Sequence, residues 1–331
     1  MLTTLKVLRL GPGIAVALAI AGVATALAQV LPLVGAPVIA IVLGILLQGR
    51  CGPAALTAPG LHFSSRSLLQ AAIVISGLGV SFNAVLRTGI ATLPVTLITV
   101  AIALALTPFI GRLLHLDRPL STLVGVGTAI CGASAIAAVS TVLESTQAET
   151  ALAIATIFFY NVLAVLVFPP IGHLMQMTQS TFGTWAGTAI NDTSSVVAAG
   201  VVYGREAAIQ ATIVKLTRAT LILPLVAAIA LAEMRFGRKR SGPIAWQRIV
   251  PWFIVWFLIA AIVNGLVAIP SAWRGPIGAL SSFLIATALA AIGLQTETRH
   301  LLRTGIRPLV LGFVLWIAVA VASLLVQRAV G

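Results

Sequence analysis

Apolar runs long enough to cross a lipid bilayer follow one another along almost the whole chain of 331 residues. A helix needs about 20 consecutive apolar residues to span the hydrocarbon core, and several runs reach that length. The runs that we expect to be helical are 14–30, 35–49, 68–84, 91–110, 119–142, 149–170, 180–202, 206–232, 249–269, 275–294 and 307–328. The loops between them are too short for a separate soluble domain. The sequence therefore predicts an all-α polytopic membrane protein in which residues 1–331 form a single transmembrane unit.

The basic charge of the chain indicates its orientation in the membrane rather than a nucleic-acid partner. Hydrophobic residues make up 60% and charged residues 8%, which excludes a soluble globular domain, so the net charge of +13 has to be read by position. With a cytoplasmic N-terminus, four basic residues fall outside: Arg87, Arg205, Arg274 and Arg328. Fourteen fall inside: Lys6, Arg9, Arg50, Arg66, Arg112, Arg118, Arg235, Arg238, Lys239, Arg240, Arg248, Arg299, Arg303 and Arg307. This bias predicts an inner-membrane protein with its N-terminus in and its C-terminus out, which needs an odd number of crossings, nine or eleven.

A tetrapeptide is repeated letter for letter within two of the apolar runs. Gly-Thr-Ala-Ile at 127–130 recurs at 187–190, 60 positions later, and small and hydroxyl-bearing residues follow each copy. Glycine-broken, polar segments among apolar runs are typical of irregular backbone around a binding site in the membrane. We therefore expect the first tip segment (119–142) and the second tip segment (180–202) to be broken or re-entrant helices.

A second repeat joins the two ends of the chain. Residues 77–90 resemble residues 293–306 at an offset of 216, and both contain the string Leu-Arg-Thr-Gly-Ile. The charge count places the first copy outside and the second inside, so the helix pairs 68–110 and 275–328 are predicted to be inverted repeats. Such repeats are common in secondary transporters. Chance similarity between apolar helices is the alternative.

Three charged residues fall inside apolar runs and away from the ends of those runs: Asp192, Lys215 and Arg218. A charge at membrane depth is costly and normally faces a partner or an aqueous cavity. Lys215 and Arg218 are three apart and share a helix face. Their charges and that of Asp192 sum to +2 − 1 = +1, which leaves room for a small anion.

Polar groups of the tip segments complete the predicted binding site, and backbone N–H groups at half-helix N-termini would add to it. Asn161 belongs to it because aligning 155–157 with 211–213, at an offset of 56, brings Asn161 to within one residue of Arg218. The predicted substrate-binding residues are Thr128, Cys131, Ser134, Asn161, Asn191, Asp192, Thr193, Ser194, Lys215 and Arg218, with Gly127, Gly132 and Gly187 as tip backbone.

Plainer interpretations of these residues stay open. Asp192 could form a bracing ion pair with Arg218, and Lys215 could snorkel, with its methylene groups in the apolar region and its ammonium group reaching towards water. The small tip residues could serve close helix packing. Asp192 could also carry a proton or hold Na⁺.

The motifs Gly125–Ala135, Trp185–Asp192, Lys215–Arg218 and Ala291–Thr296 resemble the YeiH-type family of bacterial inner-membrane proteins, which are commonly labelled sulfate exporters. The resemblance covers essentially the whole chain. It implies membership of the broad group of cation–proton antiporters, sodium–bile-acid symporters and glutamate or citrate symporters, with a panel domain and a core domain.

We therefore expect a secondary active transporter of a small inorganic or organic anion, such as sulfate, sulfite or an organosulfonate. We expect export coupled to H⁺ or Na⁺. A homodimer is one possible oligomeric state. The alternative is a cation–proton antiporter on the same scaffold. We expect no cofactor, no metal site apart from the Na⁺ alternative at Asp192, and no enzyme activity, because no pattern of catalytic residues stands out.

Overall fold

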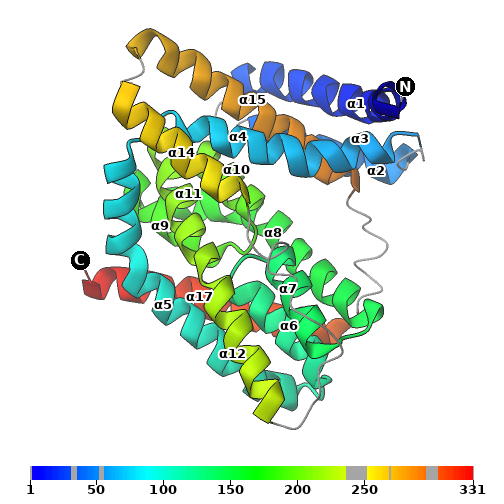
Figure 1. The fold of residues 1–331 in the computed structure, drawn as a ribbon, viewed down its shortest axis with the longest axis vertical. Coiled ribbons are helices and arrows are strands. Elements are labelled where there is room, and N and C mark those ends of the chain that lie inside the picture. Colours follow the sequence, from blue (N-terminus) through cyan, green and yellow to red (C-terminus); the bar gives the residue numbers. More distant parts are fainter. Residues whose placement is uncertain are drawn as a thin grey trace. The chain divides into compact units, whose positions relative to one another are not determined.

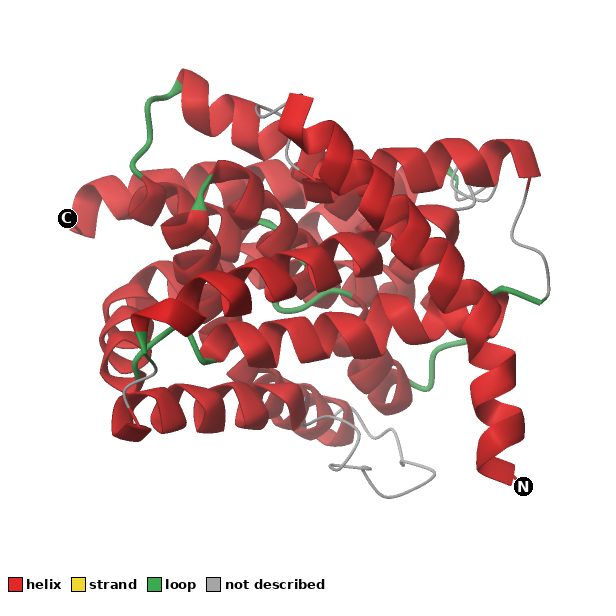
Figure 2. Ribbon diagram, turned by 90° about the horizontal axis from the view of Figure 1, so that it is seen from above, coloured by secondary structure: helices red, strands yellow, loops and turns green. Residues whose placement is uncertain are grey.

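The computed structural model describes residues 2–30, 36–51, 56–235, 252–267, 270–295 and 305–330, and every regular element in these residues is helical (Figure 2). Within the described residues, six stretches are long and apolar enough to cross a membrane: Leu10–Gln29, Phe82–Leu113, Gln147–Leu174, Arg205–Ala232 (two consecutive helices), Gly275–Gln295 and Ile306–Ala329. Three shorter apolar helices lie at Ile39–Gln48, Thr193–Tyr203 and Val255–Val267. The all-α polytopic fold class is confirmed. The number of crossings and the orientation of the termini stay predictions.

The chain divides into two compact units, each made of separate stretches of sequence. Unit 1 comprises Met1–Leu86, Val197–Ile209 and Trp252–Thr298. Unit 2 comprises Arg87–Val196, Gln210–Pro251 and Arg299–Gly331. All of the predicted site residues belong to unit 2.

Unit 1 is held together by close contacts between small residues. Its helices are α1 (Leu2–Val30), α2 (Ala36–Cys51), α3 (Ala58–Phe63), a π-helical turn (Ser64–Leu68), α4 (Leu69–Gly77), α14 (Trp252–Val267) and α15 (Ser271–Gln295). α15 packs along α2 and also contacts α1 and α4 (Figure 1). A Cβ added at Gly44 of α2 would lie 2.6 Å from the Ala290 oxygen of α15, and one at Gly293 would lie 2.4 Å from the Ile41 oxygen. Small residues that let helix backbones approach are the usual means of packing in a membrane.

Unit 2 holds both tip segments. The first tip segment is α6 (Arg118–Ala129) followed by α7 (Ala133–Leu143), and the second is α9 (Gln179–Ala189) followed by α10 (Thr193–Tyr203), whose last turns belong to unit 1. Both are broken helices, as predicted, with breaks at 130–132 and 190–192. Their re-entry into the membrane stays a prediction. The observed ends lie within one residue of the predicted ones.

Five further helices of the described residues surround the tip segments in unit 2. They are most of α5 (Phe82–Leu113), α8 (Gln147–Leu174), most of α11 (Arg205–Thr220), α12 (Ile222–Arg235) and α17 (Ile306–Val330). α17, coloured red in Figure 1, packs against α6, α8 and α9. The Trp185 indole of α9 stacks on Phe168 of α8 at 4.2 Å and donates a 3.0 Å hydrogen bond to the Ala320 oxygen of α17. These contacts fix the second tip segment against its neighbours.

The turn between α4 and α5 lies earlier in the chain than predicted. α4 ends at Gly77 and α5 begins at Phe82, where the Ser81 hydroxyl accepts a 3.3 Å hydrogen bond from the Ala84 N–H. A serine in this position is a favoured helix cap. The predicted runs 68–84 and 91–110 leave the shared string at 86–90 in a loop, and this prediction was wrong, because the string is part of α5. In the second copy, 296–304 lie outside the described residues, so the inverted repeat stays a prediction.

The run 206–232 forms two helices instead of one. α11 (Arg205–Thr220) ends just before Leu221, and α12 begins at Ile222. Pro224 explains the interruption, because it lacks the N–H that would bond to the Thr220 oxygen and its ring disfavours a continuous helix. Proline is tolerated in the first turn of α12, where N–H groups have no partner inside the helix.

Candidate functional site

The two tip segments break at equivalent positions but with different backbone conformations. In the first, Ile130 has φ −124° and ψ −86°, and Gly132 has φ +62°. In the second, Ile190 is extended, with φ −90° and ψ 135°. The positive φ explains a glycine at 132, since residues with a side chain rarely adopt it. Each break exposes the last carbonyl groups of one half-helix and the first N–H groups of the next.

Lys215 and Arg218 of α11 bind the carbonyl groups at both breaks. Both side chains are 0% exposed. The Lys215 ammonium donates to the Ile130 oxygen at 2.7 Å and to the Ile190 oxygen at 2.9 Å. The two acceptors are equivalent residues of the repeat, 60 positions apart, so one cation joins the two tip segments symmetrically.

Arg218 extends the same arrangement by one turn. Its Nε donates to the Ala129 oxygen at 2.6 Å, and its two terminal nitrogens donate to the Thr128 and Thr188 oxygens. Thr128 and Thr188 are again an equivalent pair. The C-terminal ends of α6 and α9 carry partial negative charge, so the two cations neutralise both helix ends and satisfy carbonyls that lack helical partners.

Asp192 caps a helix instead of pairing with a cation. Its carboxylate accepts a 2.9 Å hydrogen bond from the Ser194 N–H and another from the Ser194 hydroxyl. It therefore neutralises the N-terminal end of α10. Among the described residues it forms no ion pair with Lys215 or Arg218, although it lies within electrostatic reach of Lys215. The bracing ion pair with Arg218 was wrong: backbone carbonyls hold Arg218.

Asn161 of α8 lies between the two breaks. Its side-chain oxygen accepts a 3.1 Å hydrogen bond from the Asp192 N–H of the second tip segment. Its side-chain nitrogen lies 3.8 Å from the position that a Cβ would take on Gly132 of the first. The residue is 4% exposed. The alignment of the two helices that follow the tips therefore pointed to a residue that contacts both.

The remaining predicted residues have different surroundings. The Thr128 hydroxyl donates to the Val124 oxygen of its own helix at 2.9 Å. Asn191 and Cys131 are buried, and the Asn191 side-chain oxygen has no hydrogen-bond partner among the residues that the structure describes. Ser134 is exposed, and Thr193 is partly exposed.

Two of the predicted tip glycines pack closely against other residues. A Cβ on Gly127 would lie 2.9 Å from the Ile136 side chain, and one on Gly187 would lie 2.8 Å from the Ala211 oxygen. For these two positions, the helix-packing interpretation is supported. Gly132 differs, because its backbone conformation requires glycine.

Sequence reasoning missed Thr188 and Ser323. The Thr188 oxygen is a ligand of Arg218, and the Thr188 hydroxyl forms a 2.6 Å hydrogen bond with Ser323 of α17. The sequence holds a signal for each residue. Thr188 is the repeat partner of Thr128, and Ser323 is a polar residue within an apolar run.

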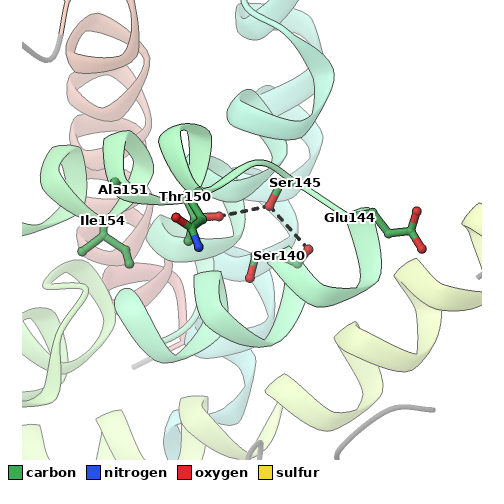
Figure 3. A pocket seen from close by; sticks show the side chains of 7 residues that line it. Ser140, Glu144, Ser145, Thr150, Ala151 and Ile154 are labelled. Atoms are coloured by element: carbon green, nitrogen blue, oxygen red, sulfur yellow. Dashed lines mark hydrogen bonds between the residues drawn. The ribbon is translucent and has the colours of Figure 1, made fainter. Parts of the chain in front are cut away.

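A separate groove of about 540 Å³ lies at the other end of α7 (Figure 3). Ser140, Glu144, Ser145 and Thr150 line it together with Gln147, Ala151 and Ile154. The Ser145 hydroxyl forms a 3.1 Å hydrogen bond with Thr150. The length of α7 separates this groove from the breaks, so it is not part of the cluster around Lys215 and Arg218.

The fold and the buried cluster define a class: an all-α polytopic membrane protein with charged side chains between two broken helices. The chain belongs to the family described as Conserved hypothetical protein 698, whose profile matches residues 12–312. The resemblance to the YeiH-type family is thereby confirmed.

Similar chains are found in several bacteria. A UPF0324 membrane protein of Streptococcus pneumoniae is 38% identical over 328 residues, which is 97% of both chains. One of Streptococcus agalactiae is 36% identical over 330 residues, again 97% of both, and one of Clostridium tetani is 37% identical over 312 residues, 90% of both. No solved structure matches the chain.

Proposed function

We propose that the protein is a secondary active transporter that exports a small anion, such as sulfate, sulfite or an organosulfonate, coupled to H⁺ or Na⁺. One observation carries the proposal. Two cationic side chains are fully buried between broken helices, and the carboxylate nearby caps a helix instead of pairing with them. With both bases protonated, the formal charges sum to +2 − 1 = +1. A buried surplus charge favours an anionic ligand.

The same contacts suggest how the binding region could move. Lys215 and Arg218 join the C-terminal ends of α6 and α9 to α11, so these three helices are expected to move as one body. Alternating access in inverted-repeat transporters comes largely from such rigid-body movement around a fixed site. We propose this mechanism here, in the inner membrane, with a cytoplasmic N-terminus and a periplasmic C-terminus. We propose transport rather than catalysis.

Counterflow in proteoliposomes tests the function. Vesicles loaded with unlabelled sulfite or sulfate should accumulate the radiolabelled anion when they contain the wild-type protein. Asp192→Asn should abolish this accumulation, because it removes the charge that could take up H⁺ or Na⁺ while keeping an oxygen for the Ser194 N–H. The control is Ser140→Ala, because the Ser140 hydroxyl donates to the Ala137 oxygen of its own helix and Ser140 lies away from the two breaks. Full counterflow by Asp192→Asn would refute the role of this carboxylate.

A cation–proton antiporter is the second candidate, and one observation favours it. Within the described residues, the Asn191 side-chain oxygen is buried without a partner beside the partly exposed Asp192. Oxygen atoms of this kind are ligands for hard cations. A pH-jump assay with Na⁺ and no transported anion distinguishes the two functions. Proton movement driven by Na⁺ alone supports the antiporter, whereas movement that requires sulfite or sulfate supports anion transport.

A further inference from the structure

The two breaks differ at one equivalent position of the repeat. Gly132 occupies in the first tip segment the place of Asp192 in the second, 60 positions on. The Asp192 carboxylate binds the first turn of α10. Gly132 has no side chain, and the start of α7 has no side-chain cap. One of the two N-terminal helix ends therefore lacks the negative charge that the other has.

Hydrogen-bond donors are available at the start of α7. Among the described residues, the N–H groups of Ala133 and Ser134 have no backbone acceptor, whereas the Gly132 N–H donates to the Gly127 oxygen and the Ile136 N–H donates to the Gly132 oxygen. Ala133 and Ser134 are exposed, so these donors are accessible to a ligand. α7 is 11 residues long, so its aligned peptide dipoles add partial positive charge at this end. Such a helix end is suited to an anion.

Asn161 supplies an independent observation that points to a ligand. The Asp192 N–H can bond only to an oxygen, so this contact fixes which end of the Asn161 amide faces the second tip segment. The NH₂ end then faces Gly132, with its nitrogen 3.8 Å from the Cβ position there. In the described part of the chain, the hydrogen bond recorded for the Asn161 side chain is the one that its oxygen accepts, so its NH₂ group is left for a ligand in a side chain that is 4% exposed.

We propose that the transported anion binds at the start of α7, where its oxyanion group takes the place that the Asp192 carboxylate takes at α10. This inference rests on the proposed function. The ligands are the N–H groups of Ala133 and Ser134, the Ser134 hydroxyl and the Asn161 NH₂. They suit one carboxylate, sulfite or sulfonate group, which offers two or three oxygens to several donors at once.

Lys215 and Arg218 have a positioning role in this arrangement. Their hydrogen bonds go to backbone carbonyls, so they hold the two breaks together and neutralise the C-terminal ends of α6 and α9. Without them, the negative end of α6 would weaken the attraction of the same break for an anion. The anion contacts the donors of α7 and α8 and not the two cations.

Thermal unfolding of the purified full-length protein tests the location. Methanesulfonate, acetate, sulfite and sulfate are each titrated against chloride at matched ionic strength, which also shows which oxyanion chemistry the site takes. Asn161→Asp keeps an oxygen for the Asp192 N–H but turns the free donor into an acceptor. We expect it to weaken binding at least about tenfold. Gly132→Asp should do the same by placing a carboxylate in the site, whereas Gly132→Asn, with the same shape and backbone strain, should bind more tightly than Gly132→Asp.

A labelling experiment covers the case in which these variants do not fold. Ser134→Cys is introduced into a chain carrying Cys51→Ala and Cys131→Ala, and its reaction with a maleimide is timed with and without the stabilising anion. The anion should slow labelling at least about threefold, because it covers the start of α7.

The outcomes separate the two proposals. If none of the four anions stabilises the wild-type protein, the proposed anion transport fails. If an anion stabilises the wild-type protein, Asn161→Asp and Gly132→Asp equally and leaves the labelling rate unchanged, the location is wrong while anion transport stands. Weaker binding by Asn161→Asp and slower labelling of Ser134→Cys together support the location.

Discussion

The two tip segments share a tetrapeptide and a broken backbone but use their helix ends differently. The C-terminal ends of α6 and α9 make equivalent contacts, since Lys215 binds the Ile130 and Ile190 oxygens and Arg218 binds the Thr128 and Thr188 oxygens. The N-terminal ends of α7 and α10 differ, because α10 has a carboxylate cap and α7 has no side-chain cap. The repeated sequence thus reproduces the break in the helix. The exchange of Asp192 for Gly132 at the equivalent position leaves the N-terminal end of α7 without a carboxylate cap.

Removal of Arg218 should have the largest effect, because it acts on both tip segments. Arg218→Leu leaves the Thr128, Ala129 and Thr188 oxygens buried without their donor. We expect the free energy of unfolding to fall by about 3–5 kcal/mol, the range for breaking a buried charged contact. Thermal unfolding in detergent measures it. The control is Arg66→Leu, since Arg66 is exposed. Equal melting temperatures for Arg218→Leu and the wild-type protein would contradict the role of Arg218.

The equivalent glycines should differ in their tolerance of alanine. At Gly187 the new Cβ would meet backbone, the Ala211 oxygen at 2.8 Å, while at Gly127 it would meet the ends of isoleucine side chains that can move. Gly187→Ala should therefore cost about 1–3 kcal/mol and Gly127→Ala less. Thermal unfolding of the two variants side by side checks this, and the reverse order would show that the first break is the more rigid one.

Neutralising the cap of α10 should have a smaller effect on stability. Asp192→Asn keeps the shape of the side chain but removes its charge from the helix end, which should cost about 0.5–1 kcal/mol. The loss should shrink at high salt if the effect is electrostatic, so unfolding is measured at two ionic strengths. A loss of several kcal/mol would mean that Asp192 has a buried ionic partner, contrary to the hydrogen bonds described.

The equivalent threonines should give the smallest difference. Thr188→Val removes a hydrogen bond to Ser323 of another helix, while Thr128→Val removes one to its own helix. We expect Thr188→Val to cost about 1 kcal/mol more than Thr128→Val. Equal melting temperatures for the two variants would show that the Thr188–Ser323 contact does not stabilise the second tip segment.

Much of the helix layout follows from the sequence because apolar runs and glycine breaks are local signals. The breaks at 130–132 and 190–192 were predicted from the repeat, and most helix ends from the apolar runs. The start of α5 is hard to predict because Ser81, which caps it, lies within a longer apolar run. The division between α11 and α12 is hard to predict because Pro224 lies in the middle of a continuous apolar run.

The binding region was harder to predict because its main acceptors are backbone atoms. The sequence singled out Lys215, Arg218, Asp192 and Asn161, which do gather near the breaks. It did not reveal that Lys215 and Arg218 bind carbonyls 25 to 90 positions away, since any residue has a carbonyl. The capping role of Asp192 was accessible, because an aspartate just before a helix is a common N-cap.

An anomalous diffraction map of crystals containing selenate tests the central claim most directly, because selenium reveals where an oxyanion binds. We predict a peak at the start of α7, within hydrogen-bonding distance of the Ala133 and Ser134 N–H groups and the Asn161 NH₂. A peak between the Lys215 and Arg218 side chains, with their carbonyl contacts broken, would contradict the account.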